Sequence, residues 1–346
     1  MKIRDSLVWA VLLLTLHLSA KQEVRASAGD DDQESKSAGP LNLVQTVPLT
    51  ELRGSFNHLT ADAKRGRFYV TAPGEKKLAV VDLKAGKVIR VLTDVPASAA
   101  IFLADLDVVC LSGGGGVTFL NGESLTPLGK VDLHSAVDEL QYDAKEQRLY
   151  AGVMDPAKPG IAIVDPHTRL LIETIGLPAK PQGFVVETSG PHLYANTPGA
   201  RQVTVVDRKK RAIVAQWKLT DTQSNYPIAL DETNHRLFVG CRRPACLLVF
   251  DTASGNTLAK IETGGDADDM SFDAINKRIY LACGDGAIST VVQTDADHYR
   301  KLPDTPTAED ARNSFFVPEL KTFYLAVPPQ KGAAAELRAY RAQAER

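Results

Sequence analysis

Short apolar runs alternate along this chain with groups of turn-forming residues. Between Pro227 and Glu262, for example, "PIALD", "RLFVG", "CLLVFD" and "TLAKIE" follow one another. Runs of this length that are rich in β-branched and aromatic residues, and bounded by Gly, Pro, Asp and Asn, predict β-strands. A helical solenoid would need apolar positions at a spacing of 3.6 residues over ten or more residues, and we find no such segment. The pattern from Leu41 onward therefore predicts an all-β protein.

The strands belong to a repeated unit. The segment "DAKRGRFYVT" at Asp62 returns as "DAKEQRLYAG" at Asp143, "DETNHRLFVG" at Asp231 and "DAINKRIYLA" at Asp273. The aromatic of this segment recurs at Tyr69, Tyr150, Tyr194, Phe238, Tyr280 and Tyr324. The period is about 42 residues, with one double gap whose midpoint falls at Cys110 in "DVVCLS". The spacing therefore predicts seven units.

A second ladder supports the same period. Apolar runs end in a polar residue at Asp82, Asn121, Asp165, Asp207, Asp251 and Gln293. Four short strands in each unit of about 42 residues are typical of a propeller blade. The last unit supplies three strands, whereas "LNLVQTVPL" (Leu41 to Leu49) is a strand without a unit of its own. We therefore predict a seven-bladed β-propeller of four-stranded blades, closed by the N-terminal strand (about 41–49), which completes the last blade and removes exposed sheet edges.

The repeated Asp and Arg suggest a structural turn. They lie between the first and second strands of a unit, where Asp can accept hydrogen bonds from the backbone of the turn and Arg can return a charge-assisted bond. Catalytic Asp–Arg pairs on four separate blades would not converge on one site. We therefore interpret these pairs as turn chemistry.

The recurring "RFYV", "RLYA", "RLFV" and "RIYL", followed by "VVD" or "VFD", resemble the YVTN-type (YncE-like) β-propeller repeat of secreted bacterial proteins. The resemblance extends from Leu41 to Arg341, although units two, four and seven lack the Asp/Arg pair in register. It implies an extracytoplasmic propeller whose ligand is usually unknown. The wider superfamily also contains quinone-cofactor dehydrogenases, a streptogramin lyase and one relative associated with DNA binding. Because the motifs are turn and core positions, they carry little information about function.

The N-terminal segment is typical of export. Lys2 and Arg4 precede an apolar run from Leu7 to Leu18 and small residues at Ser19 and Ala20, so residues 1–20 are predicted to be a signal peptide. An uncleaved anchor is the alternative, but the run is shorter than the roughly 20 residues that span a bilayer. Residues 21–40 are polar and acidic and predict a flexible linker, and residues 41–346 the propeller domain. We expect an extracytoplasmic monomer, periplasmic or secreted, with no membrane span after signal cleavage.

The formal net charge of -2 and the pI near 6.4 provide no general attraction to phosphate backbones, so we expect no nucleic-acid partner. The chain has no GxSxG, HExxH or P-loop motif. "GGDADDM" at Gly264 to Met270 contains three aspartates but lacks the EF-hand pattern. The sequence therefore predicts no catalytic residue, metal or cofactor by motif.

Propeller geometry still indicates where a site would form. The loops that lead into the first strands, and those that join the second and third strands, share one face of a propeller. From these loops we predict a ligand-binding set at the channel mouth: His58, Asp138, Gln182, Tyr226, Arg242, Arg243, Asp268, Asp269 and Arg312. We expect Asp269 to pair with Arg312 across neighbouring blades, and either a general-base role or simple hydrogen bonding for His58. Charges of both signs favour a small polar or zwitterionic ligand.

Two of the four cysteines form a candidate disulfide. Cys241 and Cys246 flank "RRPA" in a predicted hairpin, where they would face each other, and an oxidising compartment would favour the bond. Two free, half-buried thiols are the alternative. The sequence as a whole predicts a binding module for a small polar ligand or partner protein. The alternatives are a lyase or cofactor-dependent oxidoreductase with its site at the channel mouth, and a purely structural role at the cell surface.

Overall fold

The computed structural model describes residues 39–95 and 97–343, and the predicted signal peptide and most of the predicted linker lie outside this part of the chain. Pro40, which the sequence placed in the linker, belongs to the propeller, because its carbonyl accepts a hydrogen bond of 2.9 Å from Gln343 N. The described residues group as one compact unit. Among the described residues, no helix is long and apolar enough to cross a membrane.

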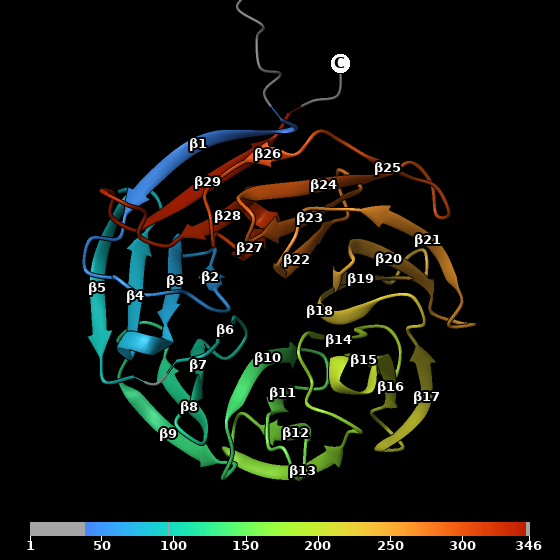
Figure 1. Cartoon of the computed structure of the whole chain (residues 1–346). Coiled ribbons are helices and arrows are strands. Elements are labelled where there is room, and N and C mark those ends of the chain that lie inside the picture. Colours follow the sequence, from blue (N-terminus) through green and yellow to red (C-terminus); the bar gives the residue numbers. More distant parts are fainter. Residues whose placement is uncertain (1–38, 96, 344–346) are drawn as a thin grey trace, which may run out of the picture. The chain divides into compact units, whose positions relative to one another are not determined.

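Seven sheets surround a central axis (Figure 1). In six of them the strands follow chain order from the inside to the outside, and in the seventh β1 is the outermost strand, beside β29. The first three blades are β2 (Thr60–Asp62), β3 (Arg67–Ala72), β4 (Lys77–Asp82) and β5 (Lys87–Thr93); β6 (Ala100–Leu103), β7 (Val108–Gly113), β8 (Gly116–Asn121) and β9 (Pro127–Asp132); and β10 (Val137–Asp143), β11 (Arg148–Val153), β12 (Gly160–Asp165) and β13 (Leu170–Gly176). The next two are β14 (Phe184–Val186), β15 (His192–Thr197), β16 (Gln202–Asp207) and β17 (Ala212–Lys218); and β18 (Gln223–Asp231), β19 (Arg236–Arg243), β20 (Ala245–Asp251) and β21 (Thr257–Glu262).

The sixth blade contains β22 (Ala267–Asp273), β23 (Arg278–Cys283), β24 (Ala287–Gln293) and β25 (Tyr299–Lys301), and the short β26 (Thr305–Pro306) also pairs with β24. The seventh contains β27 (Asn313–Val317), β28 (Thr322–Val327), β29 (Glu336–Ala342) and β1 (Leu41–Pro48). The single-turn 3-10 helices are η1 (Pro73–Glu75), η2 (Pro198–Ala200) and η3 (Pro318–Leu320). The predicted seven-bladed propeller is confirmed.

Ring closure also follows the prediction. Strand β1 runs antiparallel to β29, with Leu41 opposite Ala342 and Pro48 opposite Glu336. Pairing the two ends of the described chain in one blade satisfies the edge of β29, which an open ring would leave free to aggregate.

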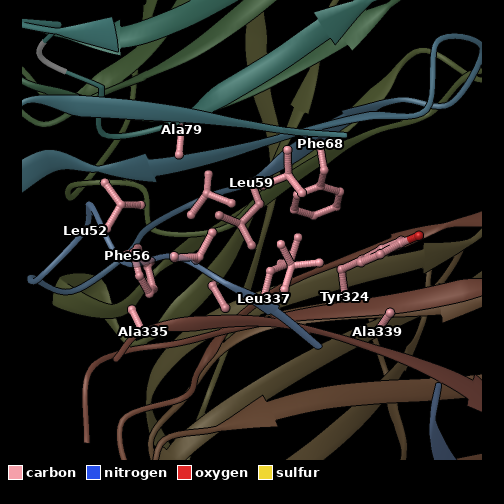
Figure 2. Close-up of a cluster of buried hydrophobic side chains, with 14 of the residues drawn as sticks. Leu52, Phe56, Leu59, Phe68, Ala79, Tyr324, Ala335, Leu337 and Ala339 are labelled. Atoms are coloured by element: carbon pink, nitrogen blue, oxygen red, sulfur yellow. The ribbon is translucent and has the colours of Figure 1, made fainter. Parts of the chain in front are cut away.

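The core lies between neighbouring blades. At the closure, Leu52, Leu59 and Phe68 pack against Tyr324 and Leu337 of the last blade (Figure 2). The Phe68 and Tyr324 ring centroids are 4.7 Å apart. Each repeat therefore buries its aromatic strand against the next repeat, which explains why the aromatic returns with the period of the blade.

The aspartate turns form as predicted, and the arginines bond both within the turn and beyond it. Asp143 Oδ1 accepts hydrogen bonds from Lys145 N at 2.9 Å and Glu146 N at 3.0 Å. Arg236 donates to the His235 carbonyl of its own turn at 2.9 Å and to Asp251, at the end of the third strand, at 2.9 Å. Arg67 donates instead to the Gly122 carbonyl of the next blade at 3.2 Å. The repeated arginine thus ties its turn to other strands in a way that differs from blade to blade.

Candidate functional site

One end of the propeller axis carries a small cavity of about 210 Å³, here called the mouth pocket. Its lining is Asn57, His58, Asp138, Gln182, Gly183, Tyr226, Arg242, Asp268 and Arg312. These residues come from the starts of the innermost strands and from the β19–β20 hairpin, and they are brought together by the closed ring. Seven of the nine predicted site residues line this pocket, while Arg243 and Asp269 do not. Arg243 is an exposed residue of the hairpin tip.

Arg242 is held in place on three sides. Its Nη2 lies 2.6 Å from Asp268 Oδ1, its Nη1 lies 3.0 Å from Asp266 Oδ1, and its Nε donates to the Ala267 carbonyl at 2.8 Å. The guanidinium also lies 4.0 Å from the centre of the Tyr226 ring, which is a cation–π distance. The planar, multiply bonded guanidinium is therefore a rigid wall of the pocket.

Arg312 pairs with Asp266, and its Nε lies 3.8 Å from Asp268 Oδ2. The predicted ion pair between Arg312 and Asp269 is wrong: the Asp269 backbone N–H donates to the Arg312 carbonyl at 3.2 Å, but the side chain turns toward His58. The register of β22 shifts between Ala267 and Asp269, so Asp268 lies in an irregular stretch of the strand. Asp268 binds Arg242 while Asp269 binds His58, and the Asn313 amide lies within 3.5 Å of both carboxylates. The two arginines thus have their charges balanced by Asp266 and Asp268.

His58 lies at the floor of the mouth pocket and is 19% exposed. Its Nδ1 is 2.9 Å from Asp269 Oδ1, and its Nε2 is 3.9 Å from Asp138 Oδ1. Burial lowers the pKa of this imidazole, but the Asp269 carboxylate, with Glu139 and Asp138, outweighs burial and raises the pKa well above 6.5. Asp269 is itself fixed, since its Oδ2 accepts the Ser314 backbone N–H at 2.8 Å. The pair is a histidine oriented by a carboxylate.

The opposite side of the pocket offers polar groups with few internal partners. Asp138 accepts a hydrogen bond from Asn57 at 3.1 Å, and no hydrogen bond to the Gln182 amide or the Tyr226 hydroxyl forms within the described part of the chain. These groups line the same cavity as His58. The pocket therefore presents a carboxylate, an amide, a hydroxyl and an imidazole toward one small space.

Tight contacts between blades four and five position Tyr226. A Cβ added to Gly183 would lie 2.4 Å from the Tyr226 carbonyl oxygen, so only glycine permits this approach. The same carbonyl accepts hydrogen bonds from Gly183 N at 3.0 Å and from Asn196 Nδ2 at 3.0 Å. The buried Asn225 amide in turn donates to Asn196 Oδ1 at 2.8 Å. Sequence reasoning missed Gly183, because a single glycine carries no signal of the neighbouring blade.

Glu139 was left out of the predicted set, although it adjoins Asp138. Its Oε2 accepts Phe184 N at 2.9 Å and its Oε1 accepts Gln141 Nε2 at 2.9 Å. Burial raises the pKa of Glu139 to about 7, against the influence of His58 and the two hydrogen bonds. Burial, with the nearby Asp269 carboxylate, also raises the pKa of Asp268. Two acids and one base with shifted pKa values thus surround the axis at this level, as is common at functional sites.

Below His58 the axis widens into a second cavity, here called the central channel, of about 1030 Å³. His58 lines both cavities and so separates them. Glu139, Asp269 and Ser314 line the channel at the level of His58, and exposed Lys64 and Glu319 line it at the opposite mouth. Much of the wall between them is apolar. This channel was not anticipated as a separate site.

Cys241 and Cys246 face each other as predicted. They are register partners on β19 and β20, but Arg242 and Ala245 also pair, so the hairpin loop is shorter than the expected four residues. Both cysteines are buried and free in the structure. A hydrogen bond to Cys246 and burial raise the pKa of Cys241. The structure thus contains the dithiol form of the pair.

No group of three or more His, Cys, Asp or Glu in the described residues is arranged to hold a metal ion. In "GGDADDM", Asp266 and Asp268 bind the two arginines and Asp269 binds His58. The three aspartates of this segment therefore pair with positively charged side chains from other blades.

Comparisons place the chain among known propellers. No family model matches it. A segment of 173 residues, 49% of the chain, is 26% identical to the protein YncE of Salmonella typhimurium (strain LT2) and 25% identical to YncE of Salmonella typhi. The chain spans about half the length of these curated relatives, with 48% of each covered. The chain is a β-propeller that is similar in sequence to YncE over about half of its length.

Solved structures share the fold of this YncE-like propeller. A chain of hydrazine synthase from Kuenenia stuttgartiensis matches with a TM-score of 0.71 and 14% identity, covering 82% of this chain and 94% of the other. A chain of the mitotic checkpoint complex matches with a TM-score of 0.75 and 16% identity, covering 96% of this chain and 99% of the other. The RRP9 WD40 repeats match with a TM-score of 0.75 and 10% identity, covering 88% of this chain and 100% of the other. Such low identities support the architecture alone.

Proposed function

We propose that the YncE-like propeller is a binding module whose mouth pocket takes a small polar or zwitterionic ligand. The observation that carries the proposal is convergence: residues from six of the seven blades meet around one cavity of about 210 Å³. On one wall the charges of Arg242 and Arg312 are already balanced by Asp266 and Asp268, which supports a ligand without a large net charge. Elsewhere in the pocket Asp138, Gln182 and the hydroxyl of Tyr226, whose ring contacts Arg242, provide hydrogen-bonding groups for it.

The pocket volume limits the size of the ligand. At about 30 Å³ per water in the liquid, the cavity corresponds to roughly seven water molecules. Amino acids and monosaccharides fall near this size and combine the donors and acceptors that the walls would match. We also propose an extracytoplasmic setting, which rests on the predicted signal peptide (residues 1–20) and would expose the pocket to such solutes.

A panel of amino acids and monosaccharides tests the proposal by thermal shift and calorimetry. Two variants are informative. Arg242→Lys removes the planar guanidinium, with its several hydrogen bonds and its stacking on Tyr226, and Asp138→Asn removes a charge from the pocket. Arg243→Ala is the matched control, because Arg243 is the exposed neighbour of Arg242. We expect a bound solute to lose about tenfold or more in affinity with both pocket variants and to retain it with the control. Equal effects of Arg242→Lys and Arg243→Ala would contradict the assignment.

The His58–Asp269 pair supports a second candidate, an enzyme that uses acid–base chemistry at the mouth pocket. Asp269 Oδ1 lies beside Nδ1, which leaves Nε2 directed toward Asp138 and the pocket. Because its pKa is raised, His58 would carry a proton at neutral pH and act as an acid. The His58→Gln variant distinguishes the candidates: an enzyme loses turnover of a bound solute, whereas a binding module has no turnover to lose.

A further inference from the structure

The central channel is a second cavity with a composition unlike that of the mouth pocket. Its volume of about 1030 Å³ lies at the upper end of the range of ligand cavities in proteins, about 300–1,000 Å³. Exposed Lys64, Pro318 and Glu319 line its far end, so this end reaches the surface. The near end is closed toward the mouth pocket by His58.

The wall of the channel is mainly apolar in its middle part. The half-buried side chains that face it include Ile101, Val185, Leu230, Met270, Phe272 and Phe315. These residues come from the innermost strands of five blades. Apolar surface that remains in contact with water inside a cavity favours an apolar occupant, because binding removes that surface from water.

The near end of the channel is lined by hydrogen-bond acceptors. Glu139 and Asp269 contribute carboxylates, and Ser314 contributes a hydroxyl. Ser314 is only 5% exposed, and its Oγ has no hydrogen-bond partner among the described residues. A buried hydroxyl without a partner is costly, so a ligand donor at this position would be favourable.

The charge balance at this end is negative. His58 is the cation that lines it, and its Nδ1 is already bound to Asp269. Among the described residues, the hydrogen-bond partners of Glu139 are the Gln141 amide and the Phe184 N–H. Arg242 and Arg312 line the mouth pocket and not the channel. Within the described part of the chain, Glu139 therefore forms no ion pair within 4.0 Å, and His58 attracts it without direct contact.

We propose that the central channel binds a small molecule with an apolar body and a primary ammonium head, with the head among Glu139, Asp269 and Ser314 Oγ. A primary ammonium has three donors, which matches the three acceptors at the closed end. The apolar body lies along the middle wall, and the molecule enters from the end lined by Lys64 and Glu319. This proposal concerns a different cavity from the mouth pocket and does not depend on what the mouth pocket binds.

Calorimetric titration with n-octylamine, 1-octanol and octanoate tests the proposal. The three probes share an apolar chain and differ in the head group. We expect octylamine to bind at least tenfold more tightly than octanol and octanoate to bind most weakly, because the carboxylates attract an ammonium and repel a carboxylate. Octylamine binding no tighter than that of octanol would overturn the proposal.

Variants separate head recognition from the apolar contact. Glu139→Gln keeps the size of the side chain, so we expect it to lower octylamine affinity about tenfold and to leave octanol affinity unchanged. Ala61→Phe narrows the channel wall and should weaken both probes. Asp138→Asn in the mouth pocket is the control and should change neither. Unaltered octylamine affinity in Glu139→Gln, or a loss in Asp138→Asn equal to that in Glu139→Gln, would refute the channel site while leaving the mouth pocket proposal standing.

Discussion

The stability of the propeller should depend on pH through Glu139. Burial raises the pKa of this carboxyl from 4.5 to about 7. The folded protein therefore holds the proton more tightly than the unfolded chain does. Well below pH 4.5, Glu139 is protonated in both states and does not lower the free energy of unfolding. As the pH rises toward 7, the carboxyl ionises in the unfolded chain but stays protonated in the folded protein, so the free energy of unfolding falls.

The magnitude follows from the shift. A change from 4.5 to about 7 is roughly 2.5 pKa units, and at about 1.4 kcal/mol per unit the full cost above pH 7 is about 3.5 kcal/mol at most. The pKa of about 7 already includes the attraction between ionised Glu139 and His58, which lowers this pKa. Glu139→Gln removes the titrating group but keeps an acceptor for Phe184 N. We therefore expect the stability of the variant relative to the natural protein to increase by about 1–3 kcal/mol from about pH 5 to about pH 8.

The assay is urea unfolding of both proteins at several values between about pH 5 and about pH 8, with the free energy of unfolding extrapolated to water. Glu51→Gln is the matched control, because it makes the same substitution at an exposed position. A stability difference between Glu139→Gln and the natural protein that stays constant across this pH range would refute the electrostatic description of the channel. So would a variant that becomes relatively less stable at high pH.

Two further predictions concern contacts that position the mouth pocket. Gly183→Ala should lower the free energy of unfolding by about 1–3 kcal/mol, because the new methyl group would overlap the Tyr226 carbonyl oxygen; unchanged urea unfolding would contradict this contact. Mild oxidation should convert Cys241 and Cys246 to a disulfide, since register partners on paired strands lie within reach of this bond. Intact mass should fall by two hydrogens, and Cys246→Ser should abolish the loss; four alkylatable thiols after oxidation and unfolding would show that the pair does not bond.

The agreement between sequence and structure has a physical origin in the repeat. A blade cannot bury its two faces alone, so each unit needs the same aromatic and apolar positions to pack against its neighbours. Tyr69 and Tyr280 therefore mark equivalent buried strands in blades one and six. The number of units and the orphan strand then lead directly to a closed ring of seven blades.

The candidate pocket was only partly predictable. Topology places the starts of all innermost strands at one end of the axis, which is why His58, Gln182 and Arg242 line one cavity. Topology does not say which of two adjacent acids faces which blade. The prediction therefore paired Arg312 with Asp269, whereas it pairs with Asp266.

The sequence by itself determined the four-stranded blade, the number of blades and the end of the ring where polar loops gather. These features follow from buried positions that repeat with the period of the blade along the chain. Only the tertiary structure decided the balance of charge around Arg242, the hydrogen bonds that hold the Glu139 carboxylate and the division of the axis into two cavities by His58. These features depend on distances of a few ångströms between side chains that are far apart in the sequence. Such distances are fixed by the packing of seven blades against one another, and no single repeat encodes them.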